Sequence, residues 1–276
     1  MSTALRIGPL CLLVFFFGYV SCQKHNPDGE PPSLTIYCAV GLRKPLENVA
    51  AAYTRECGTS VVFQFGGSGA LLSQIRVAKQ GDLYIAADDA SIANARTNQI
   101  IQESLAFASL TPVIAVKHGN PKAVKSFADL SRSDLKVAIA NPETASIGKT
   151  TRVAAGQHWN DLAHNVKMMK PTVTEIAADL ALGAVDAAVI WAPLTAQFSG
   201  LEAIHVPELD SHKECASAAV LTVSKQPREA LKFARFLAAP EHGGALLTAV
   251  GFDPIPGDPW SQTPTLMRHH AGIKGN

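Results

Sequence analysis

The feature that most constrains the fold is a regular alternation, from Leu34 onward, of short apolar runs with longer amphipathic segments. The short runs have the length of buried strands and cover residues 34–40, 60–65, 83–86, 113–116, 136–140 and 187–191. The amphipathic segments predict helices over residues 44–57, 70–79, 89–98, 126–130, 148–158 and 174–182. Strands that alternate with helices predict an α/β fold, in which helices cover both faces of mainly parallel sheets.

Three of the predicted strands end in turns that lead directly into predicted helices. These turns are Gly41-Leu42-Arg43, Gly66-Gly67-Ser68-Gly69 and the segment from Asn141 to Gly148. In open α/β sheets, ligands bind beyond the carboxyl ends of the strands, where helix N-termini present unpaired N–H groups. Several such helix ends that converge can bind an anion even when the chain has no net charge.

Composition limits the classes of partner. The chain has 276 residues, of which 47% are hydrophobic, enough for one large domain or two smaller ones. It contains 24 Lys and Arg residues against 23 Asp and Glu residues, and only 7% of its residues are aromatic. A nucleic-acid-binding protein needs a basic face that displaces counterions, so this composition argues against that class.

The first 22 residues have the features of an export leader. Arg6 precedes an apolar run, residues 10–17, that is too short to span a bilayer. Small residues before Cys22 resemble a bacterial lipoprotein cleavage site, which predicts lipidation of Cys22 and a protein exported to the periplasm or cell surface. Tyr19 stands where leucine is usual, which leaves ordinary signal cleavage and an uncleaved anchor as alternatives. Residues 23–33 then predict a flexible tether.

Cysteine and histidine usage predicts no metal site and no cofactor. Outside the leader and Cys22, the chain has Cys38, Cys57 and Cys215, an odd number that allows at most one disulfide. Cys38 lies in an apolar strand and is expected to be a small buried side chain. The His269-His270 pair lies in a polar C-terminal tail, residues 257–276, where we expect it to be solvated.

The Gly-Ser turn admits an enzymatic interpretation. Residues 66–70 approximate the G-x-S-x-G nucleophile elbow, with Ala70 in place of the last glycine, and Asp186 with His205 or His212 could complete a triad. However, about two strands precede Ser68, whereas that hydrolase fold places its nucleophile after several strands. An exported serine hydrolase that uses Ser68 is therefore the less favoured alternative.

A phosphate-binding loop is a second interpretation, since Gly148-Lys149-Thr150 follows a predicted strand. That motif requires a glycine five residues before the Gly-Lys pair, so that the backbone can wrap the phosphate chain. Glu143 occupies this position, and its carboxylate would repel the ligand. The spacing therefore argues against this interpretation.

The order and spacing of several stretches resemble the periplasmic solute-binding proteins of ABC importers, most closely the molybdate- and tungstate-binding type. The resemblance covers residues 34–254 and is carried by "IYCAVGLRKPLENVAAAYTRECGTSVVFQFGGSGALLSQI", "GDLYIAADD", "ANPETASIGKTTR", "TVTEIAADLALGAVDAAVIWAPLTA" and "ALKFARFLAAPEHGGALLTAVGFDPI". It implies a type II fold with two lobes, mixed but mainly parallel sheets and a ligand cleft between the lobes. It also implies a monomeric protein, not an enzyme, that delivers molybdate or tungstate to a membrane permease.

The resemblance implies a set of ligand-binding residues: Gly41, Leu42, Arg43, Gly67, Ser68, Ile147, Val173 and Trp191. The pattern gives Ser68 a hydroxyl contact, and Ile147 and Val173 backbone contacts. Gly41 stands where the family usually has a serine, so the backbone of this turn would donate instead. Trp191 stands where the family has a tyrosine, and its indole N–H is a donor. Three simpler roles stay open: Ser68 as a helix cap, Arg43 as a surface charge and Trp191 as part of the cleft wall.

The same resemblance divides the chain into segments. Lobe one is expected to comprise residues 34–112 and 217–256, and lobe two residues 113–216, with crossings near 109–112 and 217–221. Closure about this hinge would bury the ligand. Sulfate and phosphate are alternative ligands. Phosphate keeps a proton near neutral pH and needs an acceptor, for which Glu143 and Glu175 are the nearest carboxylates.

Overall fold

The structure, a computed structural model, describes residues 32–262. The predicted leader, the lipidation site Cys22 and the His269-His270 pair lie outside these residues. Within the described range, every helix is too short or too polar to cross a lipid bilayer.

The first sheet has six strands in the order β11-β4-β10-β3-β1-β2. They are β1 Ser33–Ala39, β2 Ser60–Gly66, β3 Leu83–Ala86, β4 Ile101–Leu110, β10 Glu214–Leu221 and β11 Asp253–Pro254. β1 is parallel to β2 and β3, whereas β10 is antiparallel to β3 and β4. We call this sheet and its helices lobe one.

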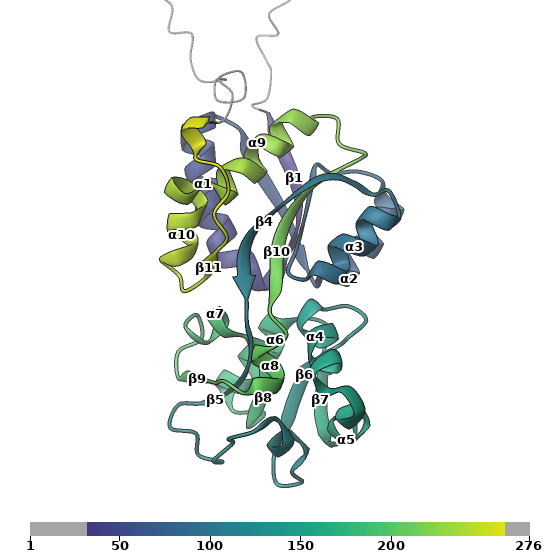
Figure 1. Cartoon of the computed structure of the whole chain (residues 1–276), viewed down its shortest axis with the longest axis vertical. Helices are drawn as coiled ribbons and strands as arrows, with labels where there is room; N and C mark the ends of the chain where they lie inside the picture. Colours follow the sequence, from purple (N-terminus) through teal and green to yellow (C-terminus); the bar gives the residue numbers. More distant parts are fainter. Residues whose placement is uncertain (1–31, 263–276) are drawn as a thin grey trace, which may run out of the picture. The chain divides into compact units, whose positions relative to one another are not determined.

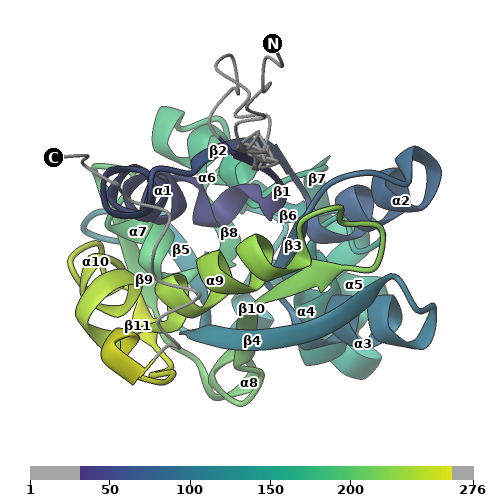
Figure 2. The same ribbon diagram turned by 90° about the horizontal axis from the view of Figure 1, so that it is seen from above.

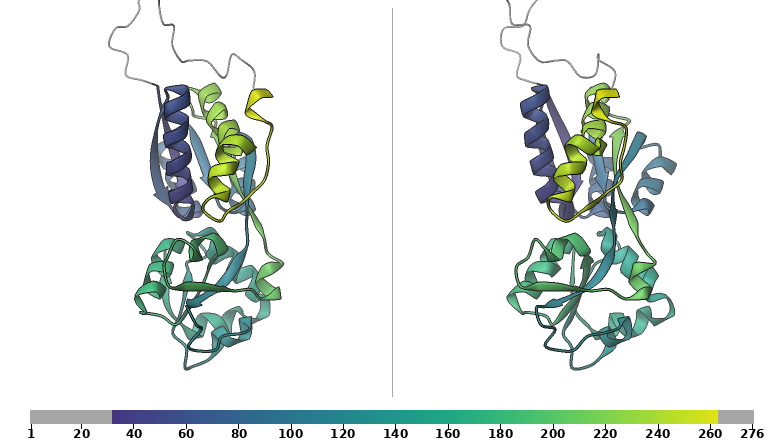
Figure 3. Two further views of the ribbon diagram at one scale, coloured as in Figure 1. Left: turned by 90° about the vertical axis from the view of Figure 1, so that its left-hand side faces the viewer. Right: turned by 60° about the vertical axis from the view of Figure 1, so that its left-hand side comes forward.

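Alternation along β1 explains why helices cover both faces of this sheet. Leu34, Ile36 and Cys38 belong to a core that includes residues of α1 (Arg43–Cys57) and α9 (Pro227–Ala238). Tyr37 points to the other face and packs in a cluster with residues of α2 (Ser68–Ala78) and α3 (Asp89–Thr97). Figure 2 shows these two helix layers on opposite sides of the strands, and Figure 3 shows α1 beside α9 and α10 (Ala245–Thr248).

The second sheet, with its helices, forms lobe two and has the strand order β7-β6-β8-β5-β9. Its strands are β5 Pro112–Lys117, β6 Val137–Ala140, β7 Val166–Lys170, β8 Ala187–Trp191 and β9 Leu201–Ile204. Its helices are η2 Phe127–Ser131, α4 Ser146–Ala155, η3 Gly156–His158, α5 Trp159–Asn165, α6 Val173–Leu182, α7 Ala192–Thr195 and α8 Pro207–Asp210. β6 is parallel to β7 and β8, whereas β5 is antiparallel to β8 and β9.

The chain passes between the two sheets twice, along β4 and β10, which lie side by side (Figure 1). The first passage joins Leu110 of β4 to Pro112 of β5, within the expected range. The return passage lies before Glu214, which already pairs with Leu110. The segment 217–221 is therefore part of the first sheet, and the return comes a few residues earlier than the sequence pattern indicated.

All six predicted strands are present, and each predicted helix overlaps an observed one, although the segment near residue 127 is a 3₁₀ helix. The α/β class and the mixed sheets are confirmed, with more antiparallel pairing than the pattern suggested. Trp260 lies within the predicted tail, yet it is buried and packs edge-on against Phe236 with ring centroids 5.3 Å apart. Residues up to Gln262 therefore belong to lobe one.

The three cysteines in the described range are not joined by a disulfide. Cys38 and Cys57 are buried, and Cys215 is half-buried. Burial raises the pKa of the Cys38 thiol well above its ordinary value, so this residue behaves as the small apolar side chain that the sequence predicted.

Candidate ligand-binding site

A small cavity of about 10 Å³ lies where strand ends of the two lobes meet. Lobe one contributes the ends of β1, β2 and β3, and lobe two contributes the starts of α4 and α6 and the end of β8. The lining residues are Ala39, Val40, Gly41, Gly66, Gly67, Ser68, Ala87, Ala145, Ser146, Ile147, Val173 and Trp191. None of them carries a charged side chain, so the potential inside the cavity depends on backbone and hydroxyl dipoles.

Three helices begin at this cavity. Ser68, Ser146 and Val173 are the first residues of α2, α4 and α6. The first N–H groups of a helix have no acceptor within that helix, and this end carries a partial positive charge. The residues before α2 and α4, Gly67 and Ala145, provide no side-chain cap. The convergence of these helix starts suits a bound anion.

Ser68 is held firmly at the start of α2. Its side chain is buried, its hydroxyl oxygen accepts a hydrogen bond from the Ala87 N–H (3.2 Å), and its carbonyl accepts one from the Tyr84 hydroxyl (2.8 Å). The N-cap of α2 is Gly67, so the Ser68 hydroxyl does not cap the helix. Because the hydroxyl uses an acceptor position for Ala87, its hydrogen is available to a ligand in the cavity.

Glycines let lobe one approach lobe two at backbone distance. A Cβ atom on Gly67 would overlap the carbonyl oxygen of Thr144. A Cβ atom on Gly69 would lie 2.7 Å from the backbone carbonyl oxygen of Glu143. In this gap the N–H groups of Gly69 and Ala70 donate to the Thr144 oxygen at 3.1 and 3.3 Å. The glycines of the motif therefore serve the contact between the lobes, in addition to the turn itself.

The first turn also packs closely against lobe two. A Cβ atom on Gly41 would lie 2.9 Å from Cγ1 of Val173 and 3.7 Å from Cδ1 of Trp191. Trp191 is 1% exposed, and the structure shows no hydrogen bond from its indole N–H to another described residue. The tight contact with Val173 gives a physical reason for glycine at position 41.

The structure does not bring Leu42 or Arg43 to the cavity, so this part of the sequence prediction is not supported. Leu42 is buried in the core. Arg43 is half exposed, with its guanidinium 4.0 Å above the Phe65 ring and 3.6 Å from Glu47. The alternative of a surface charge fits Arg43 better.

Beside the cavity, polar side chains of α4 connect the two lobes. The Lys149 ammonium donates to the Ser91 hydroxyl (2.9 Å) and lies 3.6 Å from the buried Asp88 carboxylate. The Thr150 hydroxyl donates to Glu214 at 3.0 Å, and Glu214 also accepts the Asp89 N–H at 3.0 Å. Lys149 and Thr150 therefore join α4 to lobe one, which agrees with the argument against a phosphate-binding loop.

The carboxylates that could accept a ligand proton are directed elsewhere. Glu143 accepts a hydrogen bond from Arg152 (2.8 Å), and Glu175 accepts one from the Thr172 hydroxyl (2.8 Å). Neither residue lines the cavity.

No triad forms around Ser68 in the described part of the chain. Asp186, His205 and His212 do not line the cavity. His205 instead lies 2.9 Å from Asp210, and Asp186 accepts the Lys136 N–H. This geometry argues against the hydrolase interpretation.

Of the predicted residues, Gly41, Gly67, Ser68, Ile147, Val173 and Trp191 line the cavity. Ser146 also lines the cavity but was not predicted from the sequence; its hydroxyl comes from the same turn as the Ile147 N–H. A shared sequence feature could have identified Ser146. Like Ser68, it lies between a predicted strand and a predicted helix, two residues before the predicted helix start: Ala70 follows Ser68, and Gly148 follows Ser146.

Residues 34–253 match the sequence profile of the family described as bacterial extracellular solute-binding protein. The chain belongs to this family. Its members bind solutes and are not enzymes, which confirms the prediction of a non-catalytic binding protein.

Among curated relatives, the molybdate-binding protein ModA of Mycobacterium tuberculosis is 26% identical over 247 residues, which cover 85% of this chain and 92% of that protein. Among solved structures, the periplasmic molybdate-binding protein of Azotobacter vinelandii has a TM-score of 0.69 at 18% identity, and covers 81% of this chain and 100% of its own. The sulfate-binding protein SubI of M. tuberculosis has a TM-score of 0.70 at 18% identity, and covers 81% of this chain and 87% of its own. The two structures establish the shared fold.

Proposed function

We propose that this solute-binding protein captures a fully deprotonated tetrahedral oxyanion, preferentially molybdate or tungstate, and delivers it to the membrane permease of an ABC importer. The observation that carries the proposal is the cavity itself, where three helix N-termini and the Ser68 hydroxyl meet without a charged side chain. Charge-assisted hydrogen bonds from such fixed donors can replace the water shell of a dianion.

The set of donors favours molybdate, tungstate and sulfate over phosphate. These three ions are fully deprotonated near neutral pH, whereas phosphate keeps a proton that needs an acceptor. No carboxylate lines the cavity, and Glu143 and Glu175 accept hydrogen bonds from Arg152 and Thr172 instead. A bound hydrogen phosphate would therefore lack a carboxylate acceptor.

The preference for molybdate and tungstate over sulfate rests on sequence similarity. The ModA relative is named for molybdate and matches 85% of this chain, and the sequence pattern around Ser68 and Ile147 resembles the same type. Sulfate is the second candidate, because a sulfate-binding protein shares the fold at a TM-score of 0.70. Discrimination between these ions would come from size, since a shell of backbone donors fits one radius best.

Ligand entry requires the lobes to separate. A cavity of about 10 Å³ accommodates roughly one water molecule. The Gly69 N–H of lobe one donates a hydrogen bond to the Thr144 carbonyl of lobe two, which holds the lobes together beside it. Because a tetrahedral oxyanion is larger than one water molecule, we infer that the described conformation is closed more tightly than the liganded one, and that it opens by a hinge motion at the two passages near Thr111 and before Glu214.

Calorimetry on the chain from Lys24 onward tests the ligand. Molybdate and tungstate should bind at least tenfold, or about 1.4 kcal/mol, more tightly than sulfate, with phosphate weaker still. Sulfate or phosphate equal to molybdate would overturn the ligand assignment but leave an oxyanion cleft. Absence of binding for all four ions would overturn the proposed function.

Membrane attachment through a lipid on Cys22 is a separate part of the proposal. Mass spectrometry of the mature N-terminus would detect a diacylated or triacylated Cys22. A free amino terminus at another residue would exclude it.

A further inference from the structure

We propose that Ser146 donates its hydroxyl hydrogen to the bound oxyanion and is the counterpart in lobe two of Ser68 in lobe one. This inference rests on the proposed function, because it assigns a further donor to the same anion. It adds a side-chain contact that the sequence pattern did not assign.

The environment of the Ser146 hydroxyl favours donation to a ligand. Ser146 lines the cavity and is 5% exposed. Its carbonyl lies 3.3 Å from the Thr150 hydroxyl, which also donates to Glu214, and its own hydroxyl bonds to no other described residue in the structure. The hydrogen of this hydroxyl is therefore available to a ligand in the cavity.

Ser146 and Ser68 occupy equivalent positions in the two lobes. Each serine is the first residue of its helix, and each follows an extended N-cap residue that has no capping side chain. Each lobe therefore presents a serine hydroxyl at a helix start to the cavity. In α2 the N–H groups of Gly69 and Ala70 already donate to the Thr144 oxygen, so the Ser68 hydroxyl is the main donor on that side. Position 41 in lobe one has no side chain, so Ser146 raises the number of cavity hydroxyls from one to two.

The start of α4 is fixed in place. A Cβ atom on Gly148 would overlap the Ala140 carbonyl oxygen, so the first turn of α4 packs directly on the end of β6. The Thr151 hydroxyl donates to the Ile147 oxygen at 2.6 Å, and Lys149 connects the same turn to Ser91 of lobe one. Ser146 is thus held at the cavity by groups other than its own side chain, which is the condition for a preorganised donor.

Donors on both lobes give the ligand a role in closure. An anion that accepts hydrogen bonds from Ser68 and Ser146 links lobe one to lobe two, and it makes both contacts only when the lobes are together. A ligand shifts a conformational equilibrium by its difference in affinity for the two states. Loss of either hydroxyl should therefore reduce affinity and closure together.

The test compares Ser146→Ala with Ser73→Ala in the chain from Lys24 onward, by calorimetry with sodium molybdate. Ser73 is a matched control, because its hydroxyl donates to the Gly69 oxygen on an exposed part of α2, away from the cavity. Ser146→Ala should bind molybdate about 10- to 100-fold more weakly, as expected for a lost hydrogen bond to a charged group. Ser73→Ala should bind like the parent, and the unliganded melting temperatures of the two variants should match.

A second variant, Ser146→Cys, separates donation from packing. The thiol fills similar space but is a weak donor, so its affinity should fall as in Ser146→Ala. If the parent binds molybdate and either Ser146 variant binds equally well, the inference is overturned while the proposed function stands. If the parent binds none of molybdate, tungstate, sulfate and phosphate, both are overturned.

Discussion

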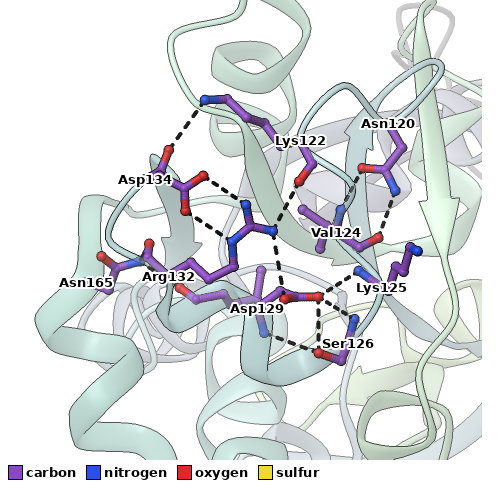
Figure 4. Close-up of polar contacts among 10 residues, drawn as sticks. Asn120, Lys122, Val124, Lys125, Ser126, Asp129, Arg132, Asp134 and Asn165 are labelled. Carbon is purple, nitrogen blue, oxygen red and sulfur yellow. Dashed lines mark hydrogen bonds and ion pairs between the residues drawn. The ribbon is translucent and has the colours of Figure 1, made fainter.

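Two polar regions of lobe two satisfy their hydrogen-bonding groups in different ways. The first is the loop of residues 120–134, drawn in Figure 4. There Asp129 accepts hydrogen bonds from the N–H groups of Lys125 (2.8 Å) and Ser126 (2.9 Å), while the Ser126 hydroxyl accepts the Asp129 N–H. Arg132 donates to Asp134 (2.8 Å) and to the Lys122 carbonyl (3.1 Å). These side chains find their partners within the same segment, and Asn165 of α5 adds hydrogen bonds to the Leu130 and Arg132 carbonyls.

The second region is the half of the cavity that lobe two provides. α4 begins after Ala145 without a side-chain cap, whereas η2 begins with a capping box formed by Ser126 and Asp129. Both helix starts leave backbone donors that need acceptors. The loop supplies those acceptors from its own sequence. At the cavity, Thr172 caps the start of α6, whereas the start of α4 leaves its first N–H groups to a ligand.

The largest effect should come from closing the gap between the lobes with a side chain. Gly67→Val would place carbon atoms against the Thr144 and Pro171 carbonyl oxygens. Backbone atoms cannot move away as a flexible side chain can, so closure should cost about 3 kcal/mol, roughly 100-fold in molybdate affinity. Calorimetry measures the loss. An unchanged affinity would show that binding does not require the described closed contact.

Ser68→Ala should have the next largest effect. It removes a hydroxyl from the cavity and should weaken molybdate binding by about 1 to 3 kcal/mol, while circular dichroism barely changes. Ser73→Ala on the same helix is the control. A mutant that binds as tightly as the parent would remove Ser68 from the ligand shell, and ester cleavage by the parent but not by the mutant would restore the hydrolase interpretation.

Asp129→Ala tests the other side of the contrast. It removes the acceptor for the Lys125 and Ser126 N–H groups, and these hydrogen bonds are the main reason that the pKa of Asp129 lies below its ordinary value. The free energy of unfolding should fall by about 1 kcal/mol, the usual cost of losing a helix cap. The affinity of the folded variant for molybdate should be unchanged. A loss of affinity would couple this loop to the cavity and weaken the comparison.

Glu214→Gln should give the smallest effect, visible as a pH dependence. Burial is the main cause that raises the pKa of Glu214 above 4.5, and the charges of Asp88 and Asp89 add to it. A carboxyl group whose pKa is raised in the folded state stabilises the fold at low pH. This stabilisation is lost as the pH rises through that pKa.

The parent should therefore lose unfolding free energy relative to Glu214→Gln as pH rises above 4.5 toward neutrality. Urea unfolding at acidic and neutral pH measures this difference. If the difference in unfolding free energy between parent and variant does not change with pH, burial does not disfavour the charged form of Glu214.

Local periodicity was enough to predict the strands that lead to the site, because β6 and β8 are continuous apolar runs and β1 and β2 are mostly apolar. It did not reveal β4 and β10, whose residues mix alanine and serine with charged positions and whose pairing joins segments more than 100 residues apart. Such pairing depends on the tertiary fold and leaves little trace in the local pattern.

The same limit explains the errors at the site. Leu42 and Arg43 belong to the turn after β1, but the short helix η1 (Val40–Leu42) buries Leu42, and α1 then begins with Arg43 directed toward Phe65. Ser146 was missed because the amphipathic pattern placed the helix start at Gly148, whereas α4 begins two residues earlier. Helix boundaries are set by backbone hydrogen bonds and packing, which hydrophobic periodicity records poorly.

Amide NMR of the chain during a molybdate titration tests the central claim most directly, because it observes both regions at once. The account predicts large shifts at the amides of Ser68 in lobe one and of Ile147 and Val173 in lobe two, all of which line the cavity. It predicts little change at Lys125 and Ser126, whose N–H groups already donate to Asp129. Shifts confined to one lobe, or equal shifts in the loop of residues 120–134, would contradict an anion held by unpaired donors from both lobes.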